Sequence, residues 1–377
     1  MSEGLTRELI LMNRIGKFTS IVLCVLLALS FSIGLVGCKG AGNGSNGSNG
    51  SNGGYGVNGE SGQNGLSDGY VIGFSNFGTG NSWRVQMEAE FMARADQLVS
   101  DGVIDEYFMM NSMGDVDQQI ADMRELIAKG CDAIIITAAS PDELSPVCEE
   151  AMEAGIVVIS FDNYVTNDNV TAKVGIDEVE FGRVGAQWLI DELDGSGNII
   201  VLNGIEGSGV DAMRNEGAKS VFAKYPDITI LEQAWAGWDY AQAKSAVEEI
   251  LAEHQQIDGV WSQGGAMTQA ALDAFIAADR PLVPMSGEAN NGLLKSWKQH
   301  LENGFDSIAP CSPTSMSADA LDTAIRALDG KLVELHTIIS LPIITSDTLD
   351  DYVRMDLPDD FWNYTILTSE QIDELYR

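Results

Sequence analysis

The sequence predicts an α/β protein with two parallel β-sheets, and three observations support this fold class. Short apolar runs alternate with amphipathic stretches of helical spacing from residue 70 onward. The runs are apolar at nearly every position, as in Ala133–Thr137, which a sheet covered on both faces requires. The chain after residue 68 has 309 residues (377 − 68), which is large for one such sheet, so we expect two.

The expected strands and helices follow one another in alternation. Strands are expected at Tyr70–Phe74, Ile104–Met110, Ala133–Thr137, Val157–Phe161, Ala172–Gly175, Ile199–Leu202, Ile228–Ala234, Val260–Ser262 and Leu282–Met285. Helices are expected at Asn81–Leu98, Val116–Ala128, Pro141–Ala154, Val179–Leu193, Met213–Lys224, Ala241–Glu253 and Thr268–Ala278. Such an alternation forms parallel sheets with right-handed crossovers, and ligand groups come from loops at the carboxyl ends of the strands.

The charge balance narrows the range of partners. The chain has 56 Asp and Glu against 21 Lys and Arg, a formal net charge of −35. A surface this acidic repels phosphate backbones, so we expect no nucleic-acid binding. Three histidines in 377 residues leave little material for acid–base chemistry, and no metal-binding motif is present. We therefore expect no metal and no cofactor.

The first 37 residues have the pattern of an export signal. Arg14 and Lys17 precede an apolar run, Ile21–Leu29, that is too short to span a bilayer. Glu3 and Glu8 do not fit a signal peptide, which indicates Met12 as the true start.

A cysteine ends this signal region in a recognisable context. Leu35-Val-Gly-Cys38 resembles the lipobox of bacterial lipoproteins, which implies that Cys38 is acylated and becomes the first mature residue. An ordinary signal peptide with a chance cysteine is the alternative. Residues 39–68 are rich in Gly, Asn and Ser, the composition of a flexible linker. We expect a protein that is exported and lipid-anchored to the outer face of the bacterial cell membrane.

The other cysteines of the mature chain are Cys131, Cys148 and Cys311. Their wide spacing matches neither a disulfide framework nor a metal site. Cys131 and Cys148 suit small buried apolar positions, and a single bridge stays open for an exported protein.

Amides, carboxylates, arginines and tryptophans recur in the loops that follow the expected strands. Indole rings pack on the C–H faces of a sugar, and planar amide, carboxylate and guanidinium groups bond its hydroxyls. Each residue also has a structural interpretation: the tryptophans as packing, Asp162 as a helix cap, Arg214 as a surface ion pair. Their concentration at strand ends favours a binding site. The candidate ligand-binding residues are Asn76, Asn81, Trp83, Arg84, Asp162, Asn163, Arg214, Trp238, Gln263 and Glu288.

Competing chemistries fit less well. Gly207-Ser-Gly-Val-Asp-Ala212 matches the dinucleotide fingerprint, but Asp211 at the helix start repels a pyrophosphate. A Ser–His hydrolase has no histidine near these loops. A secreted glycosidase needs two carboxylates, and Asp162 with Glu288 is the one pair that remains open.

Three stretches resemble the type I periplasmic-binding proteins of the ribose/galactose class. They are Ile72–Arg84, Val157–Asn163 and Gly207–Gly217, and the first is similar to that of galactofuranose-binding members. The resemblance implies two Rossmann-like lobes with parallel sheets, joined by three hinge crossovers near Ala172–Gly175, Ala309–Ser312 and Ile338–Pro342. It implies an N-terminal lobe of residues 69–175 plus 310–341 and a C-terminal lobe of residues 176–309 plus 342–377, after the signal (1–37) and linker (38–68).

The resemblance also implies a function. Such proteins capture a monosaccharide, here a pentose or hexose, in the cleft between the lobes and deliver it to an ABC permease. They are monomers and not enzymes. A sensor that docks on a receptor kinase or chemoreceptor is the alternative.

Several residues of this sequence match ligand-contacting positions of the family, and others differ from the residues usual in the family. Trp83 and Arg84 match the first-loop contacts, and Asp162 matches the carboxylate that takes a pair of sugar hydroxyls. Arg214 and Trp238 match the arginine and the stacking aromatic of the second lobe. The departures are Asn163 in place of arginine, Gly264-Gly265 in place of Asn-Asp, and Ser286 in place of aspartate, with Glu288 two residues on as a substitute carboxylate. These departures leave the sugar, its ring form and its anomer open.

Overall fold

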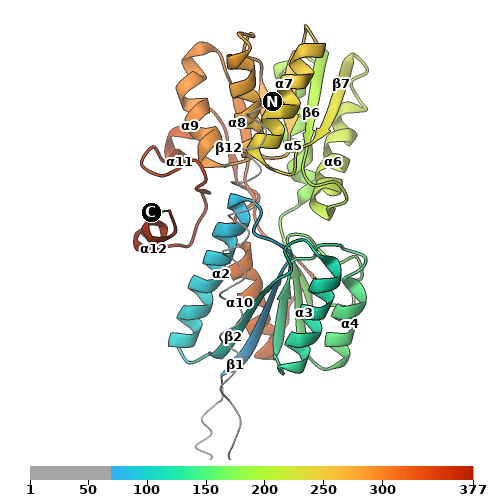
Figure 1. Cartoon of the computed structure of the whole chain (residues 1–377), viewed down its shortest axis with the longest axis vertical. Helices are drawn as coiled ribbons and strands as arrows, with labels where there is room; N and C mark the ends of the chain where they lie inside the picture. The colour runs from blue at the N-terminus through green and yellow to red at the C-terminus, as the bar shows by residue number, and fades with distance from the viewer. Residues whose placement is uncertain (1–68, 377) are drawn as a thin grey trace, which may run out of the picture. The chain divides into compact units, whose positions relative to one another are not determined.

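The computed structural model describes residues 69–376, and the predicted α/β fold with two parallel sheets is confirmed there. Figure 1 shows the two sheets, each with helices on both faces. The expected signal, the lipidation site Cys38 and the linker lie outside the described residues.

Each sheet has six strands, and the two follow the same winding order. The first is β11-β5-β4-β3-β1-β2 and the second is β12-β10-β9-β8-β6-β7. All pairs are parallel except β10 with β12. The first sheet comprises β1 (Tyr70–Asn76), β2 (Ile104–Asn111), β3 (Ala133–Ile136), β4 (Val157–Phe161), β5 (Ala172–Gly175) and β11 (His336–Ile338). The second comprises β6 (Gly197–Asn203), β7 (Ile228–Trp235), β8 (Gly259–Ser262), β9 (Met285–Ser286), β10 (Ser307–Pro310) and β12 (Ile343–Ile344).

Side chains of alternate strand positions fill two cores in each lobe. In β3, Ile135 packs with α2 and α10, whereas Ile134 and Ile136 pack with α3 and α4. In β6, Ile200 faces α7, α8 and α9, and Ile199 faces α5 and α6. The helices are α2 (Ser82–Ser100), α3 (Val116–Ala128), α4 (Ser145–Glu153), α5 (Glu178–Glu192), α6 (Gly209–Phe222), α7 (Tyr240–Glu253), α8 (Gly265–Ala277), α9 (Asn291–His300) and α10 (Met316–Leu328). A 3₁₀ turn (Leu301–Asn303), α11 (Leu349–Tyr352) and α12 (Ser369–Tyr376) complete the set.

Most predicted elements agree with these bounds to within two residues, but the helices expected from Met213 and Thr268 begin at Gly209 and Gly265, and α9 and α10 were not among the expected helices. Two other differences are informative. The strand expected at Leu282–Met285 begins only at Met285, because Pro281 precedes that run, Pro284 interrupts it, and neither proline has an N–H donor. The helix expected from Pro141 begins at Ser145, after a turn.

The chain passes between the sheets three times. It leaves the first sheet after Gly175 at the end of β5, returns after β10, and crosses again between β11 and β12. These crossings fall at the three segments expected to be hinges, and their bending on ligand binding stays a prediction.

The C-terminal segment differs from the expected lobe boundary. Residues 342–377 were expected to join the second lobe; β12 pairs there, but the end of the chain packs on α2 of the first lobe. Phe361, Leu367 and Ile372 form a small core against Ala89 and Ala93 of α2. The periodic pattern of one segment does not reveal which distant helix it will cover, and this explains the discrepancy.

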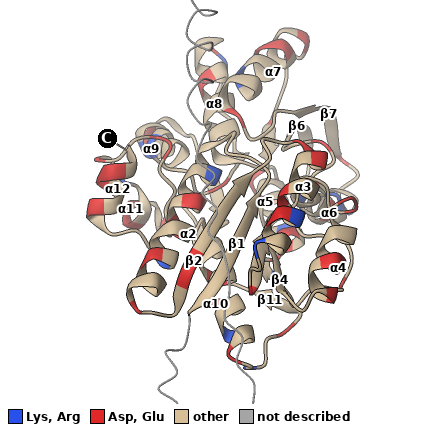
Figure 2. Ribbon diagram, turned by 60° about the horizontal axis from the view of Figure 1, so that its bottom comes forward, with Lys and Arg blue, Asp and Glu red and all other residues tan. Residues whose placement is uncertain are grey.

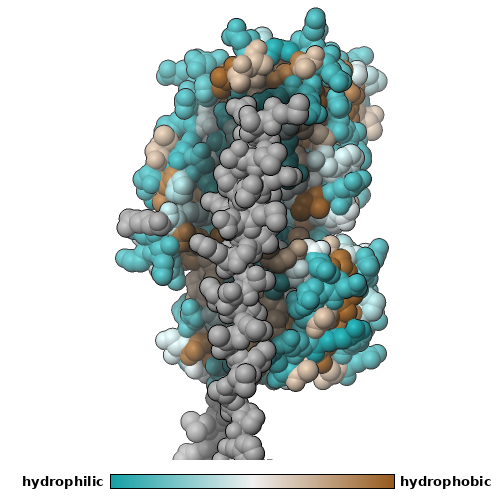
Figure 3. All heavy atoms as spheres, in the orientation of Figure 1, coloured by the Kyte–Doolittle hydropathy of each residue, from teal (hydrophilic) through white to brown (hydrophobic). Residues whose placement is uncertain are grey.

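The surface is strongly acidic, and the cysteines are internal. Figure 2 shows Asp and Glu spread over the helices of both lobes, and hydrophilic residues cover most of the visible surface that is not grey in Figure 3. Among the described helices, none combines the length and apolarity needed to cross a membrane. Cys131, Cys148 and Cys311 are buried and free, so no bridge joins these three.

Close packing of α5 against α6 depends on two glycines. A Cβ at Gly182 would overlap the carbonyl oxygen of Arg214, and a Cβ at Gly217 would overlap that of Val179. The two helices approach closely only because neither position has a side chain. This contact fixes the part of α6 that carries Arg214.

We predict that Gly182→Ala destabilises the protein, because the added methyl group must push α6 away. The free energy of unfolding should fall by about 1–3 kcal/mol, the usual range for overpacking. Urea unfolding followed by circular dichroism measures it. Gly80→Ala is the control, since no heavy atom lies within 4 Å of its Cβ position. Equal stability of the two variants would contradict the packing argument.

Candidate ligand-binding site

A cavity lies between the two lobes, at the carboxyl ends of the strands. The space there not filled by protein atoms is about 550 Å³, open solvent at its mouth included. The loops after β1 and β4 and after β6 to β10 contribute to its walls, as expected for ligand sites in parallel sheets. Its lining residues are Asn81, Ser82, Trp83, Arg84, Asp162, Ser208, Val210, Arg214, Trp238, Gly264, Gly265, Ala266, Glu288, Ser312 and Trp362.

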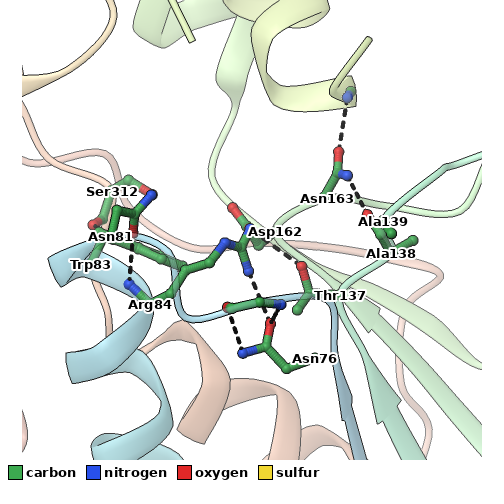
Figure 4. Close-up of polar contacts among 12 residues, drawn as sticks. Asn76, Asn81, Trp83, Arg84, Thr137, Ala138, Ala139, Asp162, Asn163 and Ser312 are labelled. Atoms are coloured by element: carbon green, nitrogen blue, oxygen red, sulfur yellow. Dashed lines mark hydrogen bonds and ion pairs between the residues drawn. The ribbon is translucent and has the colours of Figure 1, made fainter. Parts of the chain in front are cut away.

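A buried ion pair forms the part of the cavity wall that the first lobe contributes. Arg84 Nη2 donates to Asp162 Oδ2 at 2.8 Å, and Arg84 Nη1 donates to Asn76 Oδ1 at 3.2 Å (Figure 4). Thr137 Oγ1 donates to the same Asp162 oxygen at 3.2 Å. Burial lowers the pKa of Arg84, and the charge of Asp162 opposes that shift. The ion pair with Asp162 therefore offsets part of the cost of burying the Arg84 guanidinium.

The start of α2 positions Trp83 and Arg84. Asn81 caps the helix: its Oδ1 accepts from the Arg84 backbone N–H at 3.0 Å. Trp83 Nε1 donates to the carbonyl oxygen of Ser312 at 2.8 Å, so the indole is fixed against a crossover segment. The Arg84 guanidinium lies 3.7 Å from the centre of the Phe77 ring. Both side chains are thus held before any ligand arrives.

A second buried guanidinium, on α6, forms the opposite wall. Arg214 Nε donates to Glu178 Oε2 at 2.7 Å, and Arg214 Nη2 donates to Glu288 Oε1 at 3.1 Å. Arg214 Nη1 donates to the backbone oxygen of Gln263 at 2.7 Å, and the Phe181 ring stacks on the guanidinium at 3.7 Å. Arg214 thus bridges the first turn of α5 to the loops after β8 and β9.

Glu178 and Glu288 are both buried beside Arg214, and the pKa values of both carboxyl groups are shifted. Burial raises the pKa of Glu288 to about 7; Arg214 opposes the shift and Glu178 adds to it. Burial likewise raises the pKa of Glu178, again against Arg214. Burial lowers the pKa of Arg214, but the two carboxylates outweigh it and the net shift is upward. Arg214 therefore stays charged, and Glu288 is the group that titrates near neutral pH.

Trp238 is held in an unusual backbone conformation. Its φ is +55°, and Asp162 has a φ of +57°, a region that non-glycine residues seldom adopt. Strained residues of this kind concentrate at functional sites. A Cβ at Gly204 would overlap the Trp238 ring, and one at Gly264 would lie 2.7 Å from its Cδ1. The indole is therefore accommodated by two glycines.

Comparison with known proteins settles the family. A family model described as a periplasmic binding protein domain matches residues 72–332. The chain belongs to this family. The xylitol-binding protein of Mycolicibacterium smegmatis is 30% identical over 237 residues, which are 63% of this chain and 67% of that protein. The ribose import binding protein of Bacillus subtilis is 23% identical over 235 residues, 62% of this chain and 75% of that one.

Solved structures agree with this assignment and confirm the fold. An ABC transporter solute binding protein from Thermobispora bispora has a TM-score of 0.72 and 27% identity, over 81% of this chain and 94% of that chain. A galactofuranose binding protein has a TM-score of 0.67 at 21% identity, over 75% of this chain and 96% of that chain, and shows the fold alone. The matched family and the relatives are named as binding proteins, several of them for import or ABC transport, and this chain is not an enzyme. The glycosidase interpretation of Asp162 and Glu288 is accordingly wrong, and each of these carboxylates bonds an arginine.

The structure brings seven of the ten candidate residues to the cavity. Three others lie behind its walls. Asn76 supports Arg84, as described above. Gln263 Nε2 donates to Asp211 Oδ1 at 2.9 Å and to Asn203 Oδ1 at 3.2 Å, away from the cavity. The seven that line it are Asn81, Trp83, Arg84, Asp162, Arg214, Trp238 and Glu288.

Asn163, the third, joins the two lobes directly. Its Oδ1 accepts from the backbone N–H of Gly209, at the start of α6, at 2.8 Å, and its Nδ2 donates to the Ala138 carbonyl oxygen. Figure 4 shows its side chain pointing away from Arg84. In this arrangement Asn163 holds the lobes together beside the cavity, where it was expected to contact the ligand.

Close packing explains why glycine occupies positions 264 and 265, where the family has Asn-Asp. Gly264 leaves room for Trp238, and a Cβ at Gly265 would overlap the Glu288 carbonyl oxygen. A larger residue at Gly264 would displace the indole, and one at Gly265 would displace the backbone of Glu288. Ser286 does not line the cavity, and its Oγ accepts from the Ser262 N–H at 3.2 Å; Glu288 does line it.

Eight of the lining residues were not among the ten candidate ligand-binding residues. Ser82, Ser208, Val210 and Ala266 lie next to residues that were named, so strand-end position alone could have suggested them. Trp362 lies far along the chain, in a segment for which no strand or helix was expected. The aromatic pair Phe361-Trp362 in an acidic tail was the available signal.

One group of metal-ligating side chains occurs within residues 69–376. Glu232, Glu253 and His254 place their ligand atoms within 4.8 Å of one another, but none of them lines the cavity. The absence of a metal or cofactor requirement stays a prediction.

We predict a pH-dependent difference between Glu288→Gln and the wild type. A carboxyl group whose folded pKa is about 7, against an ordinary value of 4.5, contributes stability below pH 4.5 that is lost as pH rises through 7. Glutamine does not titrate, so the free energy of unfolding of the variant relative to wild type should rise between about pH 4.5 and 7 and then level off. Denaturant unfolding at a series of pH values measures this difference.

Glu216→Gln, an exposed position on α6, is the matched control and should show no such rise. A difference between Glu288→Gln and wild type that is constant over this range would contradict the raised pKa of Glu288.

Proposed function

We propose that this protein captures a neutral monosaccharide, a pentose or hexose, in the interlobe cavity and delivers it to an ABC importer. The observation that carries the proposal is the cavity itself: a buried guanidinium–carboxylate group on each lobe, with indole rings between them. This is the combination that bonds sugar hydroxyls and covers the C–H faces of a ring.

Several polar atoms of the cavity are free to bond a ligand. Within the described residues, Asp162 Oδ1 and Arg84 Nε have no protein partner, and Trp238 Nε1 is buried without one. A buried donor without a partner has a substantial free-energy cost unless a ligand or water bonds it. Sugar hydroxyls both donate and accept, so they suit a mixed set of a carboxylate oxygen and N–H groups.

The charge of the site favours a neutral ligand. Arg84 and Arg214 provide two positive charges, and Asp162, Glu178 and Glu288 provide three negative ones when all are ionised. Among the described residues that line the cavity, no cation is left over to pair with a ligand carboxylate or phosphate. Sugar acids and sugar phosphates should therefore bind much more weakly than neutral sugars.

A ligand as small as a monosaccharide must be almost completely enclosed by the protein to bind with micromolar affinity. A monosaccharide has about a dozen non-hydrogen atoms, and micromolar affinity corresponds to about −8.2 kcal/mol, or roughly −0.7 kcal/mol per atom. This is high for a polar ligand, so both lobes must contact it. We expect the three crossovers to bend as the lobes close, and the protein to act as a monomer.

Delivery to an importer rests on the family and on the N-terminal sequence. The relatives include ribose import binding proteins and ABC transporter solute binding proteins. A lipid on Cys38 and a linker to residue 68 would keep the binding domain at the outer face of the membrane, beside a permease.

A sensor is the second candidate, favoured by one comparison. The fructose binding periplasmic domain of a hybrid two-component system has a TM-score of 0.66 and 26% identity, over 75% of this chain and 92% of that chain. Loss of sugar uptake in a deletion strain would support transport. Normal uptake with loss of the transcriptional response to the sugar would support sensing.

We predict that Asp162→Asn and Trp238→Ala each weaken sugar binding by roughly ten- to a hundredfold, through a lost charged acceptor or lost ring contact. A thermal-shift screen over pentoses, hexoses and pentitols identifies the ligand, because a ligand at 100 times its Kd adds about 2.7 kcal/mol of stability. Calorimetry then gives Kd for each variant.

Trp235→Ala is the matched control for Trp238→Ala, since Trp235 is nearby, 49% exposed and does not line the cavity. Arg214→Ala is a poor test, because it strands two buried carboxylates and should cost about 3–5 kcal/mol of stability. Wild-type affinity in both Asp162→Asn and Trp238→Ala would mean that the ligand binds elsewhere.

A further inference from the structure

The end of the chain makes a contribution that the family match does not cover. The matched domain ends at residue 332, whereas residues 353–376, here called the C-terminal strap, continue beyond the last strand and contact both lobes. One strap residue, Trp362, lines the cavity and is 5% exposed.

The second lobe holds the strap through Asn291, at the start of α9. Asn291 Nδ2 donates to the carbonyl oxygens of Arg354 at 2.8 Å and Pro358 at 2.9 Å, and its Oδ1 accepts from the Arg354 N–H at 2.9 Å. The Asn291 backbone N–H donates to the Phe361 carbonyl oxygen at 3.0 Å. Asn291 thus holds the first part of the strap, together with Lys295, whose Nζ pairs with Asp359 Oδ1 at 3.0 Å.

The first lobe holds the strap through Gln86, on α2. Gln86 Oε1 accepts from the Trp362 N–H at 2.9 Å, and Gln86 Nε2 donates to the Trp362 carbonyl oxygen at 2.9 Å. Tyr376 OH donates to Gln86 Oε1 at 2.7 Å. The apolar residues of the strap that follow pack on the same helix, as described above.

The attachments of the strap to the two lobes fall on consecutive residues. The carbonyl oxygen of Phe361 bonds the second lobe, and the N–H of the next residue, Trp362, bonds the first. The strap is therefore a fourth link between the lobes, beside the three crossovers. The positions of the strap and of Trp362 therefore depend on the relative orientation of the two lobes.

Trp362 lines the cavity with an indole that has no polar atom left to bond a ligand. Its one polar atom, Nε1, already donates to Ser82 Oγ at 3.0 Å. A C–H group of a ligand that faces this wall gains contact, whereas a hydroxyl that faces it loses its water and finds no partner. Such a wall distinguishes sugars that differ in one hydroxyl.

We propose that Trp362 is a ligand-contacting, selectivity-determining residue that the C-terminal strap carries into the interlobe cavity. This inference rests on the proposed binding of a monosaccharide there. It adds a ligand contact from outside the matched domain and ties that contact to lobe closure.

The test compares Trp362→Ala and Trp362→Phe with Leu367→Ala, which removes a strap contact with α2 that does not line the cavity. Calorimetry measures Kd for the best wild-type ligand among pentoses, hexoses and pentitols, and for its epimers and deoxy analogues. In folded Trp362→Ala, Kd should rise about ten- to a hundredfold, and the ratio of Kd values between the best ligand and its epimers should shrink severalfold. Leu367→Ala should lower Tm and leave both quantities unchanged.

Trp362→Phe keeps an aromatic wall, so it should fold and bind within a few-fold of wild type. Its ligand-induced change in tryptophan emission should be smaller, because one of the three indoles that line the cavity is gone. Unchanged Kd and selectivity in folded Trp362→Ala, or an unchanged emission response in Trp362→Phe, would overturn the inference while leaving the proposed function intact. A wild-type protein that binds none of these sugars would contradict the proposed function, and the inference with it.

Discussion

Two buried guanidinium groups, one in each lobe, constrain the rest of the binding site. A buried charge is tolerated only when it is paired and hydrogen-bonded, so Arg84 requires Asp162, and Arg214 requires Glu178 and Glu288. These partners come from different loops, which means that each pair fixes the relative positions of several strand ends. Loss of one partner would disturb the cores as well as the ligand contacts.

Glycines at close contacts allow the polar and aromatic groups of the site to reach their positions. Gly182 and Gly217 let α6 approach α5 so that Arg214 reaches Glu178. Gly204 and Gly264 leave the space that the Trp238 indole occupies. The resulting site has rigid polar groups on both walls and rigid rings between them, which lowers the conformational entropy that ligand binding must overcome.

The sequence was sufficient for the fold because local periodicity determines its elements. The helix expected at Val116–Ala128 has those bounds in the structure, and the apolar run expected at Ala133–Thr137 forms a central strand, Ala133–Ile136. Strand-end position also located most of the cavity. It could not say whether a side chain in such a loop turns inward: Asn163 bonds the other lobe, and Gln263 bonds Asp211 behind the wall.

The contribution of the C-terminal strap could not be predicted for a different reason. Trp362 reaches the cavity because Gln86, 276 residues away in sequence, bonds its backbone. Neither residue carries a local signal of that pairing. The same holds for Gly264, whose role depends on a ring that follows a different strand.

We propose that one small neutral sugar is held between the lobes by polar groups from both of them. A crystal structure of the protein with the best ligand from the binding screen tests this most directly. We expect a sugar that is almost fully enclosed, with hydroxyls within hydrogen-bond distance of Asp162 Oδ1 and Arg214 and with the Trp238 ring against its carbon atoms. A ligand that contacts one lobe only, or that lies outside this cavity, would contradict it.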